Sequence, residues 1–216
     1  MNNIRHSGRS GIEEKMKREQ TVLTGNENFE MHGIVQDANI SDFWAWSMSR
    51  LLADGPRGDL AEFIVRLALG ESITIPKRGW GECDIIHRGK RIEVKCSSVI
   101  QEWERDHPSR PVFSIRPTYA SDIAEGVEGG YRYVGRQSND LCRRSDVYVF
   151  CLFSNPNRQT ANPLKLEQWT FYVVSTNTIN KELGRRKTVS LPTLEKIGSI
   201  KCDFPKIRLA VQSVLA

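Results

Sequence analysis

Hydrophobic positions along the chain change their spacing near residue 70. Between residues 39 and 69, apolar side chains recur at intervals of three and four, as on one face of a helix. This pattern predicts a helix capped by Ser41, a break at residues 53–58 and a second helix from Asp59 to about Leu69. The predicted buried positions are Phe43, Trp44, Met48, Leu51 and Leu52 in the first helix, and Leu60, Phe63, Ile64, Leu67 and Ala68 in the second.

Beyond residue 70 the apolar spacing shortens towards two, which is typical of strands. Residues 83–86 and 90–96 are predicted to pair as a hairpin across a tight turn at His87-Arg88-Gly89. Helices on both sides of a cluster of strands predict an α/β fold, with a mixed β-sheet core flanked by helices in one domain over residues 39–216. Other strands are predicted at residues 72–76, 112–115, 146–153 and 169–175, helices at 99–106, 179–184, 191–197 and 205–215, and loops at 121–137 and 154–163.

Residues 1–38 are more polar and are predicted to form a flexible, partly mobile N-terminal arm, with one short helix near residues 12–19. The whole chain has 216 residues, 39% of them hydrophobic, which is enough for one sizeable core. No run approaches the roughly 20 apolar residues that cross a bilayer, and the charged N-terminus lacks the apolar stretch of a secretory signal. These features predict a soluble cytoplasmic protein with no membrane partner.

The chain carries a net charge of +5 and has a pI near 9.0. This surplus is compatible with a polyanionic partner, although a solvated basic face would explain it equally well. The five cysteines are scattered, which predicts free thiols in a reducing compartment and no zinc site. Because no phosphate-binding glycine loop has the spacing of a nucleotide-binding fold, no nucleotide cofactor is expected.

The hairpin segment holds the residues with the clearest chemistry. Asp84 lies at the start of the first strand, and folding back at Gly89 brings it beside Glu93. Two carboxylates on one face repel each other unless a cation lies between them. Their oxygens, with the backbone carbonyl of Val94, are the hard ligands that Mg²⁺ prefers. Lys95, two residues beyond Glu93, would orient or deprotonate a metal-bound water, or hold a phosphate oxygen.

This arrangement resembles the PD-(D/E)XK nuclease superfamily, whose signature is an acid at a strand start followed by Glu-x-Lys on the next strand. Here Asp84 is followed, after eight residues, by Glu93-Val94-Lys95. The resemblance implies a restriction-endonuclease-like fold and a Mg²⁺-dependent nuclease, with Mn²⁺ as a substitute ion. It also implies that Asp84 and Glu93 bind the metal and that Lys95 serves the attacking water.

Many members of the superfamily also carry a glutamate on the helix before the hairpin. Glu62 lies on the predicted helix 59–69, in the same order, and by resemblance would hold a second metal or a metal-bound water. Gln101 looks like the Gln that follows the lysine in some members and is a weaker candidate for positioning substrate or water. A surface ion pair between Glu62 and Arg66, one helical turn later, is the alternative role for Glu62.

Two features depart from the superfamily pattern or leave its assignment open. Cys83 stands where proline usually precedes the first acid, and Glu82 would replace Asp84 as ligand if the strand were registered differently. Glu93 and Lys95 would also suit a solvated edge strand, where charged side chains prevent aggregation. Asp84 would then be an ordinary acid at a strand end.

If the chain is a nuclease, basic side chains would follow the phosphate backbone of DNA, although each cluster also suits a solvated surface. Trp80 and Trp103 would stack on unpaired bases, whereas core packing is the commoner role of tryptophan. Trp44, Trp46 and Trp169 are predicted to pack in the core or between helices. The candidate nucleic-acid-binding residues are Lys77, Arg78, Arg88, Lys90, Arg91, Arg143, Arg144, Arg185, Arg186 and Lys187.

The predicted function is hydrolysis of DNA phosphodiester bonds in a prokaryotic or phage-related cytoplasm. A homodimer is plausible because cutting both strands at once usually takes two sites. Two alternatives remain open at the level of sequence. One is a non-catalytic nucleic-acid-binding module on the same fold, and the other is a protein-interaction domain whose hairpin charges serve solvation.

Overall fold

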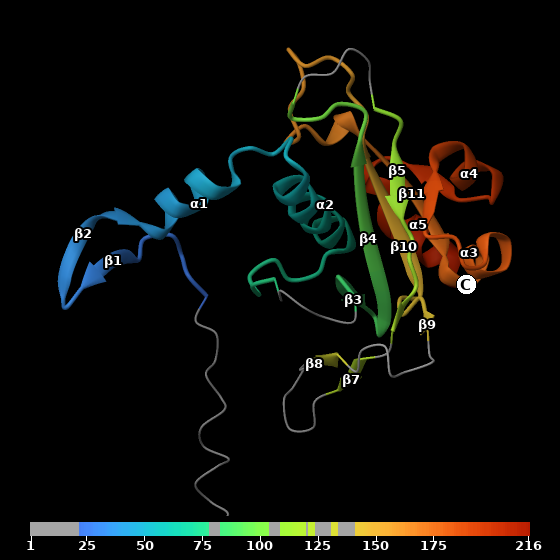
Figure 1. Ribbon diagram of the computed structural model, residues 1–216, viewed down its shortest axis with the longest axis horizontal. Coiled ribbons are helices and arrows are strands. Elements are labelled where there is room, and N and C mark those ends of the chain that lie inside the picture. Colours follow the sequence, from blue (N-terminus) through green and yellow to red (C-terminus); the bar gives the residue numbers. More distant parts are fainter. Residues whose placement is uncertain (1–21, 78–82, 104–108, 120, 124–130, 134–140) are drawn as a thin grey trace, which may run out of the picture.

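The centre of the molecule is a mixed five-stranded sheet with the strand order β13-β11-β10-β4-β3 (Figure 1). The computed structural model describes residues 22–77, 83–103, 109–119, 121–123, 131–133 and 141–216. Strands β4 and β10 are parallel, and the other neighbours in this sheet are antiparallel. The five strands are β3 (Ile85–His87), β4 (Lys90–Ser98), β10 (Val147–Phe153), β11 (Trp169–Ser175) and β13 (Ile200–Cys202).

Helices cover both faces of this sheet, so the protein has three layers and two apolar cores (Figure 1). On one face, α2 (Asp54–Leu69) and α5 (Ile207–Leu215) pack against the side chains that alternate inward from β4, β10 and β11. On the other face lie α3 (Thr176–Leu183) and α4 (Leu191–Lys196). The α/β class and the mixed sheet flanked by helices are therefore confirmed.

The two central strands, β10 and β11, are almost entirely buried and apolar, which is why the sequence pattern located them well. All seven residues of β10 are buried, which makes the strand a continuous apolar run, as expected when helices cover both faces of a sheet. The neighbouring β11 has the same character and begins and ends at the predicted residues 169 and 175. Their full antiparallel register, from Val147 opposite Ser175 to Phe153 opposite Trp169, fixes the middle of the sheet.

Small elements complete the described part of the chain. β5 (Val112–Ser114) pairs with β12 (Thr188–Ser190). Phe113 of β5 is buried in the apolar core between the sheet and α3 and α4. The predicted loop 121–137 contains two of the short strands. The other elements are β1 (Asn28–Met31), β2 (Ile34–Asn39), α1 (Ile40–Met48), β6 (Thr118–Tyr119) with β9 (Leu141–Cys142), β7 (Ser121–Ile123) with β8 (Tyr131–Tyr133), and the 3₁₀ turns η3 (Leu166–Gln168) and η4 (Phe204–Lys206).

A hairpin occupies part of the segment predicted as a polar arm. β1 and β2 pair antiparallel across a two-residue turn at His32-Gly33. Both turn residues have positive φ values, 52° and 80°, which is the type I′ geometry that matches the twist of a hairpin. The short helix predicted near residues 12–19 lies outside the described residues.

The first helix begins earlier than predicted because a different residue caps it. Asn39, not Ser41, is the N-cap, and its side chain accepts from the backbone N–H of Asp42 at 3.1 Å. The Asp42 carboxylate in turn accepts from the Asn39 N–H at 2.8 Å, which completes a capping box. The hydroxyl of Ser41 instead donates to the carbonyl of Gly25 at 2.9 Å.

The second helix also differs from the prediction in its start and its buried face. It begins at Asp54, because the break predicted at residues 53–58 is helical from that residue on. Its buried residues include Ala61, Ile64, Val65 and Leu69, whereas Phe63 and Leu67 remain 45% and 43% exposed. The predicted stripe is therefore rotated by about one residue, so that only Ile64 of the predicted positions is fully buried.

Several other expectations also need correction. Residues 72–76 form no strand, and residues 99–103 of the predicted helix 99–106 are not helical. Trp46 is 82% exposed and Trp44 40% exposed, whereas Trp169 is buried as predicted. Among the described residues, no helix has both the length and the apolar character to cross a membrane.

Candidate active site

The β3–β4 hairpin forms as predicted and brings the first two candidate acids together. Its turn, Arg88-Gly89, has φ values of 50° and 75°, again a type I′ geometry. Ile85 lies opposite Ile92 in the register of the two strands. Asp84, the residue before Ile85, is therefore placed beside Glu93, the residue after Ile92.

Asp84 lies just before β3 and is held there by two hydrogen bonds to β4. Its backbone N–H donates to the carbonyl of Ile92 at 3.2 Å, and its carboxylate Oδ2 accepts from the Val94 N–H at 2.7 Å. The carboxylate thus takes the place of a strand carbonyl and fixes its own position. In a strand, the N–H and C=O of one residue point to the same edge, so the Val94 carbonyl lies on the edge where Asp84 lies.

Glu93 and Lys95 lie on the face of β4 opposite to the buried Ile92 and Val94. The Glu93 Oε1 and the Lys95 Nζ form an ion pair at 2.5 Å. The other oxygen, Oε2, accepts from the Ser145 hydroxyl at 3.0 Å. Both carboxylate oxygens of Glu93 are therefore oriented by partners, and both side chains are partly buried, with 21% of Glu93 and 31% of Lys95 exposed.

Ser145 is a site residue that sequence reasoning missed. It is 4% exposed and lies just before β10, 52 positions from Glu93 in the chain. Its own carbonyl accepts from the hydroxyl of Thr176 at 2.6 Å, which fixes the serine at the start of α3. No local pattern marks Ser145, because its contact with Glu93 depends on the parallel pairing of β4 with β10.

Glu62, on α2, lies close enough to Asp84 and Lys95 for its charge to act on both. Its Oε2 accepts from the Lys77 ammonium at 2.8 Å, and the same ammonium contacts Asp59 at 2.5 Å. The alternative partner, Arg66, instead donates from Nε to the carbonyl of Ser72 at 2.5 Å. Lys77, predicted to contact DNA, is thus engaged by two acids of α2.

Burial and neighbouring charges shift the pKa values of two groups in this cluster, Asp84 and Lys95. Burial, with the charges of Glu93 and Glu62, raises the pKa of Asp84 to about 6. Burial opposes the charged form of Lys95, but the carboxylates of Glu93, Asp84 and Glu62 outweigh it and raise the pKa of that ammonium. Lys95 is therefore protonated at neutral pH, so in this state it donates hydrogen bonds and does not accept a proton.

The oxygen atoms in this cluster are of the type that binds Mg²⁺. Among the described residues, no group of three or more His, Cys, Asp and Glu side chains is arranged to hold a metal. Magnesium does not require such a cage, because it commonly binds one or two carboxylates together with several waters and a substrate phosphate. Asp84, Glu93 and the Val94 carbonyl would supply those protein oxygens, and a cation would offset the burial and the neighbouring carboxylates that raise the pKa of Asp84.

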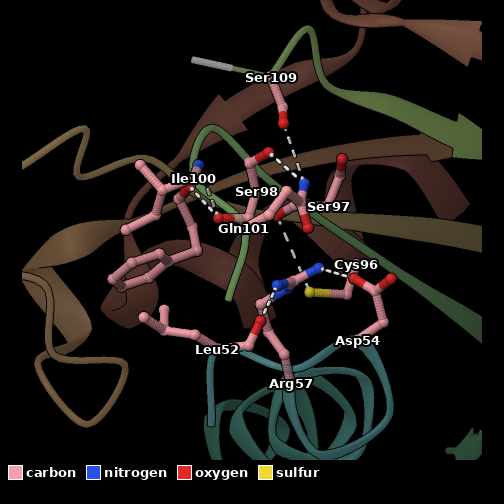
Figure 2. A network of polar contacts seen from close by, with 10 residues as sticks. Leu52, Asp54, Arg57, Cys96, Ser97, Ser98, Ile100, Gln101 and Ser109 are labelled. Atoms are coloured by element: carbon pink, nitrogen blue, oxygen red, sulfur yellow. Dashed lines mark hydrogen bonds and ion pairs between the residues drawn. The ribbon is translucent and has the colours of Figure 1, made fainter. Parts of the chain in front are cut away.

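Gln101 is not brought to this cluster. Its Nε2 donates to the Ser109 hydroxyl at 3.2 Å and to the Ser98 carbonyl at 3.5 Å, beyond the far end of β4 (Figure 2). Glu93 and Ser98 are five positions apart on β4, which separates the two places by about 16 Å of strand. The same network contains the buried Arg57, which donates to the Leu52 carbonyl. Gln101 thus lies in a structural network.

Arg143, predicted to contact DNA, is a buried structural residue. It is 8% exposed, and its Nε donates to the Ile115 carbonyl at 2.8 Å. Its two Nη atoms donate to Asn180 Oδ1 at 2.6 Å, to the Gly184 carbonyl at 2.9 Å and to the Arg186 carbonyl at 2.8 Å. These four bonds tie the residue after β5, α3 and the loop after α3 together, so the guanidinium is engaged in the packing of these segments.

The remaining basic candidates differ in their exposure. Arg91 is half-buried, and its backbone N–H donates to Asp146 at 2.8 Å, while its Nε lies 3.6 Å from the same carboxylate. Arg144 is also half-buried. Arg78, with Trp80 and Glu82, lies outside the described residues. The exposed candidates are Arg88 and Lys90 at the hairpin turn, and Arg185, Arg186 and Lys187 after α3.

Comparison with protein-family models gives no match, and no curated protein shows significant similarity to the chain. The chemistry of the cluster can still be stated from its own residues. Two adjacent carboxylates, a protonated lysine and a third carboxylate on a neighbouring helix suit the handling of a cation together with an anionic substrate.

The raised pKa of Asp84 predicts that this residue costs the protein stability. Because the native state binds the proton more tightly than the unfolded state, whose ordinary value is 3.8, the free energy of unfolding falls as pH rises from 4 to 6. We expect Asp84→Asn, measured by urea unfolding in EDTA, to be more stable than wild type by about 1–3 kcal/mol at pH 7.5.

The same experiment at pH 4 should show almost no difference between Asp84→Asn and wild type. Glu167→Gln, at an exposed glutamate of η3, is the matched control and should follow the wild-type profile at every pH. A variant of Asp84 that is destabilised at pH 7.5 would show that the ionised carboxylate stabilises the fold.

Proposed function

We propose that this protein is a metal-dependent nuclease that hydrolyses DNA phosphodiester bonds, with a restriction-endonuclease-like fold. The observation that carries the proposal is the partly buried Asp84 carboxylate, with a pKa of about 6, placed beside the Glu93–Lys95 ion pair. A carboxylate in this state gains from a nearby divalent cation. Asp84, Glu93 and the Val94 carbonyl would hold Mg²⁺, for which Mn²⁺ would substitute.

The metal, when bound, supplies positive charge to the scissile phosphate and lowers the pKa of an attacking water. Lys95, protonated and held at 2.5 Å from Glu93, donates to that water or to a phosphate oxygen. Ser145 keeps the second oxygen of Glu93 in place from the neighbouring strand. Glu62 lies close enough to raise the pKa of Asp84 and would hold a second metal or a metal-bound water.

Exposed basic residues near the hairpin support DNA as the polyanionic substrate. Arg88 and Lys90 project from the turn that joins the two strands of the site. Contacts from such side chains to phosphates position a duplex without reading its sequence. A prokaryotic or phage-related cytoplasm is the location that we propose for this activity.

The test is cleavage of supercoiled plasmid and of long phage DNA by the full chain, with Mg²⁺ or Mn²⁺ and with EDTA as control. We expect conversion to nicked or linear product only when metal is present. Retardation of the DNA in gels without any cleavage in either metal would instead identify a non-catalytic nucleic-acid-binding module.

A further inference from the structure

Residues 22–48 extend away from the sheet as a unit of their own, here called the projecting segment (Figure 1). It contains the hairpin of β1 and β2 followed directly by α1. None of the residues of α1 is buried, although the helix has a complete capping box. The segment is therefore well formed locally and has almost no core.

Apolar side chains cover the projecting segment. Phe29 and Met31 lie on one face of β1, and Met31 pairs across the turn with Ile34 of β2. Half of the large exposed apolar side chains in the described part of the chain belong to this segment. They are Val22, Leu23, Phe29, Met31, Ile34, Val35, Phe43, Trp44, Trp46 and Met48.

Such a surface needs a partner. An isolated two-stranded hairpin is marginally stable in water, and so is a helix as short as the nine residues of α1. From the exposed fractions, at about 200 Å² for each large side chain, the segment offers on the order of 1,000 Å² of apolar area. The largest apolar patch of a typical monomer is roughly 300–600 Å².

The negative charge of the projecting segment favours a partner with a basic surface. It carries Glu27, Glu30, Asp37 and Asp42 and has no Lys or Arg, so its charge is −4. Because the whole chain carries +5, the rest of the chain carries +9. An acidic apolar surface is repelled by nucleic acid and by anionic lipid, and it is also repelled by another acidic segment of the same kind.

We propose that the projecting segment is a dimerisation element that packs on the basic body, residues 49–216, of a second copy of this chain. In a two-fold symmetric dimer each copy contributes one segment, so the two together bury roughly 2,000 Å² of apolar area, within the range of stable interfaces. Opposite charges on segment and body orient the contact. This dimer does not depend on the proposed nuclease activity.

The test is sedimentation equilibrium of the full chain at low salt. We expect wild type to have twice the monomer mass of 24.6 kDa, and Met31→Glu/Ile34→Glu to raise the dissociation constant by about 100-fold. Far-UV circular dichroism checks that the variant is folded. The matched control is Leu164→Glu, at a leucine 66% exposed outside the segment, which should leave the dimer intact.

A second variant separates packing on the body from packing of two segments on each other. Glu30→Lys/Asp37→Lys should weaken the dimer about tenfold or more, because the reversed charges then face a basic body. An unchanged or tighter dimer in this variant would overturn the proposal. It would also be overturned by a wild type that remains monomeric up to about 50 µM, or by a Met31→Glu/Ile34→Glu variant that dimerises as well as wild type.

Discussion

Replacing Lys95 with alanine is expected to slow metal-dependent DNA cleavage by about 10²–10³-fold, the size of effect found when one preorganised electrostatic donor is removed. The raised pKa of Lys95 keeps its ammonium charged beside Glu93 and Asp84, where negative charge would gather on the scissile phosphate in the proposed reaction. Single-turnover rates with enzyme in excess over DNA measure this effect without a contribution from product release.

Lys90→Ala is the matched control, because Lys90 lies on the same strand but is exposed at the hairpin turn. It should keep the rate of the chemical step within a few-fold of wild type and weaken DNA binding modestly. If Lys95→Ala cleaves at the wild-type rate, Lys95 has no part in the reaction.

Replacing Arg143 with methionine is expected to lower the free energy of unfolding by about 3–5 kcal/mol, at about 1–3 kcal/mol for each buried carbonyl that loses its donor. The change leaves the carbonyls of Ile115, Gly184 and Arg186 without the guanidinium that now satisfies them. For a chain of this length the loss corresponds to a fall of about 10 °C in the melting temperature, measurable by calorimetry.

The control for Arg143 is Arg185→Met, two residues before the Lys187 carbonyl that accepts from the Ile115 N–H. Arg185 is exposed, so its replacement should change the melting temperature little. An Arg143→Met variant with wild-type stability and reduced DNA affinity would restore the original prediction that this residue contacts DNA.

The layers of the fold could be predicted from the sequence because they follow local periodicity. The continuous apolar runs of β10 and β11 and the period-two pattern of β4 have few other interpretations. The hairpin of β1 and β2 was not predicted, although His32-Gly33 is the same kind of turn signal as Arg88-Gly89. Its strands face solvent on both sides, so they lack the pattern of a buried face.

In the candidate site, too, the local arrangement could be predicted and the long-range contacts could not. Asp84, Glu93 and Lys95 could be predicted together because a hairpin joins them within twelve residues. The Ser145 contact with Glu93 and the Lys77 contact with Glu62 join separate elements, and nothing in the local sequence specifies them.

For Arg143, the local sequence suggested an exposed side chain, whereas the side chain is buried. Two adjacent arginines suggested a basic surface, yet the chain directs Arg143 inward, where three backbone carbonyls from two segments converge on it. Sequence alone does not reveal such carbonyls, because their direction is set by how the segments pack. Net charge and clustering therefore overestimated the exposed basic surface.

The most direct test of the proposed site compares wild type with Glu93→Gln, which keeps the shape of the side chain and its acceptor for the Ser145 hydroxyl. Cleavage of supercoiled plasmid in Mn²⁺ and DNA affinity in EDTA are measured on the same preparations. We expect wild type to cleave, Glu93→Gln to lose cleavage, and both to bind DNA with closely similar affinity. Cleavage by Glu93→Gln at the wild-type rate, or no metal-dependent cleavage by wild type, would contradict the proposed site.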